Sequence, residues 1–345
     1  MKKAIISVAA LLALTACGVK DAVQDDAAGS VFPPSGKVTL TANWAGAPGS
    51  TKTVRQADGK VYWAANESIQ VYAVAAEGVT FTSLNTTPSA TASFTGTIPR
   101  EYYEEMNQEG GKDSARRMWD LFPVLVAIYP YYDYEAVEWR YTELATVNYA
   151  SYQVIRGERV GVGEPISYVI SHWLPTTQTA VPGTFASNLF VSATASASTT
   201  LNFHHVTGGL KFSVTSSDIN RAELKANGND FISGTGHYTI APDGTLIEAH
   251  GVDDDYIGGN VVTIQPESGN LVPGEYYYFI TWPATLPGGF TLTFYTGTGS
   301  KERVITQNLE FKSGRFLVLD DADANIDEHS GVHGDLDPIT YDPIN

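Results

Sequence analysis

The sequence predicts an all-β protein composed of two β-sandwich domains. Its 345 residues are rich in Thr, Ser, Gly, Tyr and Val, and only 17% of them are charged, which is typical of short, half-buried strands. Apolar and polar residues alternate in segments such as 38–43 and 210–215, so each of these segments has one apolar face. Gly, Pro and Asp separate the segments, as turn residues do in β-sandwiches.

Further strands are predicted along most of the chain. Asp58-Gly59 is a hairpin signal, and Tyr276–Trp282 is apolar on both faces, so we expect it to be a central strand. Glu101–Trp119 departs from this pattern, because it combines helix formers with two adjacent glycines, and it predicts a small helical insertion in the first domain. The remaining strands are predicted at residues 61–63, 69–74, around 81, 92–98, 290–295 and 316–319.

A low-complexity run at Ser192–Thr200 is the best place to divide the chain. It is interpreted either as a linker or as an edge strand with small side chains. A chain of this length is sufficient for about two domains. The predicted segments are a lipoprotein signal peptide (1–17), a flexible tether (18–36), an N-terminal β-sandwich domain (37–200), a C-terminal β-sandwich domain (201–320) and an acidic C-terminal tail (321–345).

The charge of the chain argues against one class of partner. Lys and Arg together number 21 and Asp and Glu 38, so the formal net charge at pH 7 is −17. A field of this sign repels phosphate backbones and anionic membrane surfaces. We therefore expect no nucleic-acid partner.

The first 17 residues have the features of a lipoprotein signal peptide. Lys2 and Lys3 precede an apolar run that is too short to span a bilayer. The sequence Leu-Thr-Ala-Cys that follows is a lipobox, which predicts cleavage between Ala16 and Cys17 and lipidation of Cys17. Several acyl chains, palmitate among them, then give durable anchoring in the outer membrane.

Two further questions about this region stay open. A soluble secreted protein could also carry a cysteine in its signal, but Cys17 is the only cysteine in the chain, so no intramolecular disulfide can use it. The tether contains Asp21, Asp25 and Asp26, which resemble the acidic signal that exports lipoproteins of one Gram-negative phylum to the outer face of the outer membrane. An ordinary polar linker has the same composition.

A series of segments, in chain order, carries a resemblance to a known family. They are 58–74 (DGKVYWAANESIQVYAV), 87–98 (TPSATASFTGTI), 126–131 (VAIYPY), 175–185 (PTTQTAVPGTF), 202–214 (NFHHVTGGLKFSV), 274–297 (GEYYYFITWPATLPGGFTLTFYTG) and 311–319 (FKSGRFLVL). Together with the lipobox they resemble the fimbrillins, the type V pilus subunits and related surface lipoproteins of Gram-negative gut and oral anaerobes. The resemblance covers most of the mature chain.

The resemblance implies a fold and a mechanism of assembly. Fimbrillins consist of two tandem transthyretin-like β-sandwich domains and are exported as lipoproteins. A trypsin-like, Arg-specific protease removes their first strand, and a strand of another fimbrial subunit then fills the open groove by β-strand addition. Because this contact is head-to-tail, its repetition builds a fibre. The resemblance therefore implies a structural fimbrial (pilus) subunit at the cell surface.

The resemblance also assigns residues of this chain to the two steps of maturation. The removable strand would be Lys37–Trp44, and the maturation cleavage would follow Arg55, which comes after a Gly- and Pro-containing loop that is expected to be accessible. Lys52 is a weaker candidate, because the protease of the family prefers Arg. Alternatively, Arg55 is a solvated hairpin residue beside Asp58 that is never cut.

The C-terminal tail departs from the family pattern. From Asp320 to Asn345 it is rich in Asp and Glu and has no Lys or Arg, and glycines and prolines interrupt its second half. A donor strand needs apolar side chains at alternate positions and few prolines, whereas Ile339, Tyr341 and Ile344 are the few residues here that fit. The tail is therefore expected either to be disordered or to pack on its own domain. Its acidic residues also lack the spacing of a calcium loop.

No part of the sequence has the pattern of a catalytic, cofactor or metal site. His204 and His205 are neighbours at the predicted start of a strand, so their side chains face opposite sides and cannot bind one ion together. The other histidines lack metal-ligand spacing. Glu104-Glu105 and Asp253–Asp255 could serve as glycosidase acids, but such runs are usually solvated loops. We expect that the protein is not an enzyme and has no cofactor.

Two other functions stay open. A surface glycan-binding lipoprotein of a polysaccharide-uptake system would have the same anchor and β-sandwiches, and would bind sugar on exposed aromatic rings. Tyr131–Tyr134 with Trp139 is the densest such group in a chain with 19 Tyr and 6 Trp, although packing in a core is the alternative role for these aromatics. A tip or anchor subunit that adheres to a host molecule would keep the fimbrial fold.

Overall fold

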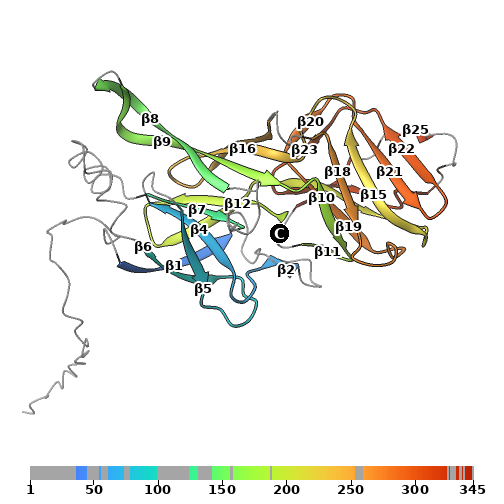
Figure 1. Cartoon of the computed structure of the whole chain (residues 1–345), viewed down its shortest axis with the longest axis horizontal. Helices are drawn as coiled ribbons and strands as arrows, with labels where there is room; N and C mark the ends of the chain where they lie inside the picture. The colour runs from blue at the N-terminus through green and yellow to red at the C-terminus, as the bar shows by residue number, and fades with distance from the viewer. Residues whose placement is uncertain are drawn as a thin grey trace, which may run out of the picture.

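The computed structural model describes the strands of the chain and most of their connections (Figure 1). The described residues are 36–44, 54–55, 61–73, 78–98, 124–130, 142–155, 158–186, 189–252, 259–324, 326, 332–333, 336 and 339–343. All regular elements in these ranges are β-strands, which confirms the predicted all-β class. The predicted helical insertion at Glu101–Trp119 and the hairpin signal Asp58-Gly59 lie outside the described residues.

Strand β1 (Gly36–Trp44) belongs to a seven-stranded sheet that closes on itself. It pairs antiparallel with β6 (Ala92–Ile98) and parallel with β13 (Thr200–His205), so it has a partner on each side. This closure leaves no edge among the seven strands, and a transthyretin-like β-sandwich in this part of the chain stays a prediction. The other members, in spatial order from β13 to β6, are β12 (Ser192–Ser196), β7 (Leu125–Tyr129), β4 (Ser68–Ala73) and β5 (Val79–Ser83).

Strand β12 corrects the interpretation of the low-complexity run at Ser192–Thr200. The first part of the run is neither a linker nor an edge strand, because it lies between β13 and β7 in the closed sheet. Residues 192–195 are buried, and a Cβ added at Gly244 would lie 2.8 Å from the hydroxyl of Thr194. Small side chains are therefore required here, since other parts of the chain pack closely against the strand.

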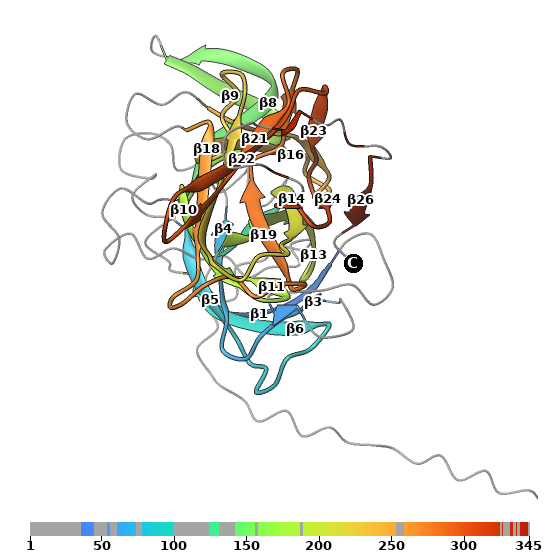
Figure 2. The ribbon, with the colours of Figure 1, turned by 90° about the vertical axis from the view of Figure 1, so that its right-hand side faces the viewer.

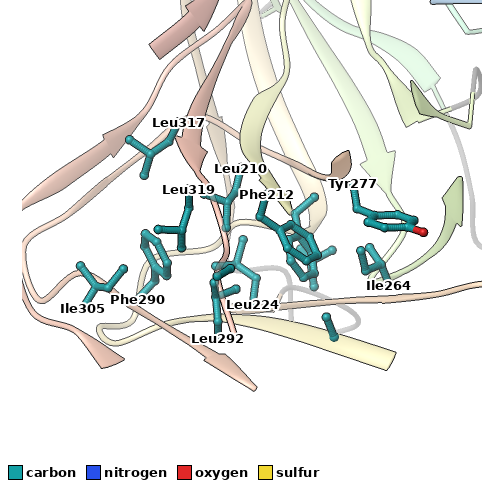
Figure 3. Close-up of a cluster of buried hydrophobic side chains, with 14 of the residues drawn as sticks. Leu210, Phe212, Leu224, Ile264, Tyr277, Phe290, Leu292, Ile305, Leu317 and Leu319 are labelled. Carbon is teal, nitrogen blue, oxygen red and sulfur yellow. The ribbon is translucent and has the colours of Figure 1, made fainter. Parts of the chain in front are cut away.

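Two further sheets enclose one apolar core (Figure 3). The larger sheet contains, in spatial order, β11 (Thr184–Phe185), β10 (Thr177–Val181), β18 (Val261–Gln265), β15 (Ile219–Ala226), β21 (Phe290–Thr296), β22 (Ser300–Ile305) and β25 (Val332–His333). The smaller sheet contains β19 (Tyr276–Thr281), β14 (Gly208–Ser213), β24 (Arg315–Leu319) and β26 (Tyr341–Pro343). Leu210 and Phe212 of β14 face Leu224 of β15 and Leu292 of β21 across this core.

A long hairpin that the sequence did not reveal forms part of a fourth sheet. Strands β8 (Thr142–Ile155) and β9 (Glu158–Leu174) pair with each other, and β16 (Gly234–Ile240) pairs with the inner part of β9. The outer part of the hairpin extends beyond β16, as Figure 1 shows. The remaining strands are β17 (Leu246–Gly251), which pairs with β16, and the two-stranded pairs β2 (Val54–Arg55) with β3 (Val61–Tyr62) and β20 (Ala284–Leu286) with β23 (Leu309–Phe311).

An additional apolar core lies between the closed sheet and the sheets of the second half. Val126 of β7 contributes to it from one side and Tyr278 of β19 from the other. The neighbouring residues face the opposite way. Leu125 lies in the core of the closed sheet, and Tyr277 lies in the core between the sheet that contains β15 and the sheet that contains β14, called below the two large sheets. Strands β7 and β19 are therefore covered on both faces, and the three cores are connected through them.

The predicted central strand Tyr276–Trp282 corresponds to β19, and the expectation that both of its faces are apolar and buried is confirmed. Its pairing differs from the expectation, because β19 is the outermost strand of its sheet. Gln178 of β10 covers its outer side: the Gln178 amide donates to the carbonyl oxygen of Ile280 at 2.7 Å and accepts from the Ile280 N–H at 3.0 Å. A side chain thus supplies the hydrogen bonds that a neighbouring strand would otherwise provide.

The division into domains 37–200 and 201–320 stays a prediction. The sheets combine strands from both sides of this boundary, since β13 pairs with β1, β10 pairs with β18, and β9 pairs with β16. The early and late parts of the chain are therefore connected by shared sheets. They are also connected by the core between the closed sheet and the sheets of the second half, called below the middle core.

The beginning of the acidic tail is fixed to the second half by a buried carboxylate. Asp323 is 3% exposed, and it accepts hydrogen bonds from the N–H of Thr215 at 2.6 Å and the N–H of Ser216 at 2.9 Å. Burial raises the pKa of the Asp323 carboxyl, but the hydrogen bonds from Thr215 and Ser216 favour the charged form and leave the pKa below its usual value.

Replacing Asp323 by Asn is expected to lower the free energy of unfolding at neutral pH by about 1–3 kcal/mol, because buried N–H groups lose a charged acceptor. The folded-state pKa is lowered, so the charged form contributes stability above the unfolded-state pKa of about 3.9, and this contribution is lost as the pH falls through the folded-state pKa. Urea unfolding between neutral and acid pH measures both effects. The exposed control Asp218→Asn should change neither, and identical curves for the two variants would contradict the assignment.

Candidate functional site at the first strand

Strand β1 contains the alternation of apolar residues that the sequence analysis singled out, and this alternation is confirmed. Four alternate side chains are buried in the closed sheet: Val38, Leu40, Ala42 and Trp44, with exposed fractions of 5%, 0%, 0% and 6%. Thr39 between them is exposed, as is Lys37 before them, and Thr41 and Asn43 are half-buried. Because successive side chains of a strand point to opposite faces, this one short segment supplies a continuous apolar face to the core.

Backbone pairing holds β1 along both of its sides. Residues Gly36 to Ala42 pair with β6, and residues Thr41 to Trp44 pair with β13. The N–H of Thr41 also donates to the carbonyl oxygen of Thr199 at 2.8 Å. Without β1, strands β6 and β13 would each present an unpaired edge, and a groove lined by apolar side chains would lie between them.

Aromatic rings surround the last residue of β1. The indole of Trp44 stacks on the rings of Trp63 and His205, with centroid distances of 4.7 Å and 4.5 Å, and lies 5.8 Å from the ring of Phe203. Trp63 in turn contacts Tyr129 edge-on at 5.6 Å. Contacts of this kind contribute about 0.5–1.5 kcal/mol each beyond the burial of area. The end of β1 that leads toward Arg55 is therefore its most specifically packed part.

Arg55 lies in the short strand β2, where its backbone pairs with Val61 of β3. This pairing agrees with the interpretation of Arg55 as a hairpin residue, and cleavage after it stays a prediction. A cut at this position would separate β1 and β2 from β3 and the rest of the chain. The side chain of Arg55 lies outside the described residues.

Several residues predicted from the sequence lie outside the described part of the structure. They are Ala16 and Cys17 of the lipobox, Lys52, Asp21, Asp25 and Asp26 of the tether, Glu104-Glu105, Tyr131–Tyr134, Trp139 and Asp253–Asp255. In the described part, no helix has the length and apolar character needed to cross a membrane.

The described histidines include His204 and His205, which are neighbours in the chain. His204 and His205 lie at the end of β13 rather than at its start, and His205 Nδ1 is 3.1 Å from the hydroxyl of Ser192. Burial lowers the pKa of His204, which Asp243 raises in part, and burial lowers the pKa of His172 to about 3. Among the described residues, no group of three His, Cys, Asp or Glu is arranged to hold a metal ion.

Sequence reasoning missed two features of the site. One is the parallel pairing of β1 with β13, because the two strands are far apart in the chain and no local pattern reports a partner. The other is the stacking of His205 on Trp44. The alternation of Leu201 and Phe203 with polar residues, which continues to His205, was the available signal for β13.

Comparison with known proteins found few similarities. A scan against known protein families found no match, and neither did a search of curated proteins. One solved structure is similar: a proposed cell adhesion protein from Bacteroides ovatus ATCC 8483, with 11% identity, a TM-score of 0.37, and coverage of 81% of this chain and 86% of that chain. A likeness at this level carries no argument about fold or function.

Replacing Trp44 by Ala is expected to lower the free energy of unfolding of the closed sheet by about 3–5 kcal/mol, because a large side chain leaves a packed site. The control Thr39→Ala removes an exposed side chain from the same strand and should cost less than about 1 kcal/mol. Denaturant unfolding monitored by tryptophan fluorescence and by circular dichroism compares the two. Equal losses would show that the Trp44 side chain does not hold β1 in place.

Proposed function

We propose that the protein is a structural fimbrial subunit of the fimbrillin type, assembled by exchange of strand β1. The observation that carries the proposal is that one nine-residue strand near the N-terminus closes a sheet and has backbone partners on both sides. Such a strand can be replaced by any extended segment with the same alternation, because the backbone bonds are the same for every sequence. We also propose that the subunit has the fold of this type, with two tandem transthyretin-like β-sandwich domains.

Maturation begins with a cut after Arg55 by a trypsin-like, Arg-specific protease. β1 is then held only by non-covalent contacts. Its departure exposes the apolar surface that Val38, Leu40 and Trp44 cover in the intact chain. Burial of each such side chain contributes about 1.5–3 kcal/mol, so an incoming strand that fills the same positions recovers what the departing strand loses. Exchange is therefore close to balanced in free energy.

The location of the subunit follows from the signal segment. Lipidation at Cys17 anchors the newly exported chain in the outer membrane, and the acidic residues of the tether direct it to the cell surface. The cut after Arg55 removes this anchor together with β1 and frees the body of the protein for incorporation into a fimbrium. In this proposal, the assembled fibre, and not the single subunit, binds any host or glycan ligand.

Limited digestion with an Arg-specific protease should produce a chain that begins at Gln56. A labelled peptide with the sequence of residues 36–44 should then bind to the digested chain and not to the intact one. Arg55→Gln should prevent both cleavage and peptide binding, whereas Lys52→Gln should leave both unchanged. Mass spectrometry and fluorescence anisotropy provide the two measurements. A digested chain that begins at Gln56 and does not bind the peptide would refute strand exchange.

A further inference from the structure

The last two described strands, β25 and β26, lie at edges of the sheets of the same molecule. β25 pairs in parallel with β22, and β26 pairs antiparallel with β24. Each is the last strand of its sheet, and Figure 2 shows β26 beside β24. In a protein that builds fibres by giving a terminal strand to its neighbour, that strand has to be available. The described parts of this tail are already paired within the same molecule.

Side chains hold β26 at its position. The ammonium group of Lys211 forms an ion pair with Asp342 at 2.6 Å, with side chains that are 14% and 30% exposed. The hydroxyl of Tyr341 donates to the carbonyl oxygen of Glu310 at 2.8 Å. The ammonium group of Lys312 lies 4.9 Å from the centre of the Tyr341 ring. A partly buried ion pair and a charged contact on an aromatic ring both favour the docked position of the strand.

Three apolar residues of the tail are buried within the same molecule, whereas Ile339 is 41% exposed. Ala322, Ile326 and Leu336 lie in the core between the two large sheets, with exposed fractions of 0%, 7% and 8%. The N–H of Leu336 also donates to the side chain of Gln307 at 2.9 Å. Release of the tail would therefore expose part of this core.

The sequence of the tail does not fit the groove that β1 fills. β1 places four apolar side chains at alternate positions, and no stretch from Asp320 to Asn345 does so. The alternation of Ile339 and Tyr341 continues with Pro343, and that of Ala322, Ala324 and Ile326 continues with Glu328. Pro338 and Pro343 lack the N–H groups that a strand paired on both sides requires.

We propose that this chain receives a strand from another subunit and that its residues 320–345 are not a donor strand, so that the chain does not polymerise with itself through this segment. The inference rests on the proposed function, since it concerns the direction of the same strand exchange. The partner is a different chain whose free strand has four alternate apolar residues and ends with an aromatic ring that fits between Trp63 and His205.

The test uses the full-length chain in detergent, digested after Arg55, with two synthetic peptides as probes. The first probe, called the receiving peptide because it tests whether the groove receives a strand, has the sequence of residues 36–44. The second probe, called the tail peptide because it tests whether the tail can be supplied as a strand, has the sequence of residues 320–345. Native mass spectrometry should show one receiving peptide per chain and no bound tail peptide. The digested chain alone should remain monomeric at high concentration on gels run without heating.

The outcomes separate the inference from the function on which it rests. If the receiving peptide binds and the digested chain nevertheless forms heat-resistant ladders or binds the tail peptide, the inference is wrong and the proposed function stands. If the receiving peptide does not bind, both are wrong. Lys211→Ala, which removes the ion pair to Asp342, extends the test. If this variant forms ladders, the tail can act as a donor strand once the ion pair that holds β26 is removed. This result would also contradict the inference.

Discussion

The structure depends on the pairing of β1 with two neighbours at once. Strands β6 and β13 are separated by a large part of the chain, and β1 connects them by backbone bonds and by the four side chains that it buries. Closure of the sheet leaves none of its seven strands with an open edge, whereas its opening creates two edges and an apolar groove together. A single segment near the N-terminus therefore decides whether this sheet is closed or has two open edges.

The remainder of the fold resists the opening of that sheet. Strands β7 and β12 of the closed sheet also pack against the middle core, which contains side chains from β9, β16 and β19. The side-chain amide of Gln178 fixes β10 to the outer side of β19 by hydrogen bonds to the carbonyl oxygen and the N–H of Ile280. Because these contacts do not involve β1, removal of the first strand should leave β7 and β12 in place, and β12 pairs with β13, one of the two walls of the groove. A preformed groove lowers the conformational cost of binding an incoming strand.

Local patterns in the sequence predicted the class of the fold and the strand at the site, since alternation at 38–44 and 210–214 reports directly which side chains are buried. They failed at two other places in the chain. The small residues of β12 were interpreted as a linker or an edge, and the hairpin of β8 and β9 was not predicted at all. Partners far apart in the chain, such as β1 with β13 or Gln178 with Ile280, leave no local signal. The lipobox at Cys17 and the cleavage after Arg55 stay predictions.

The central claim is that β1 is a replaceable closing strand, and hydrogen exchange of its backbone amides tests this claim most directly. In the intact chain, the amides of residues 37–44 should exchange slowly, because residues 36–42 pair with β6 and residues 41–44 pair with β13. After a cut at Arg55, exchange in β1, β6 and β13 should accelerate at least tenfold, while exchange in β14 and β19 remains unchanged. Equal protection of β1 before and after the cut would contradict the account, since it would show that the strand stays in place when only non-covalent contacts hold it.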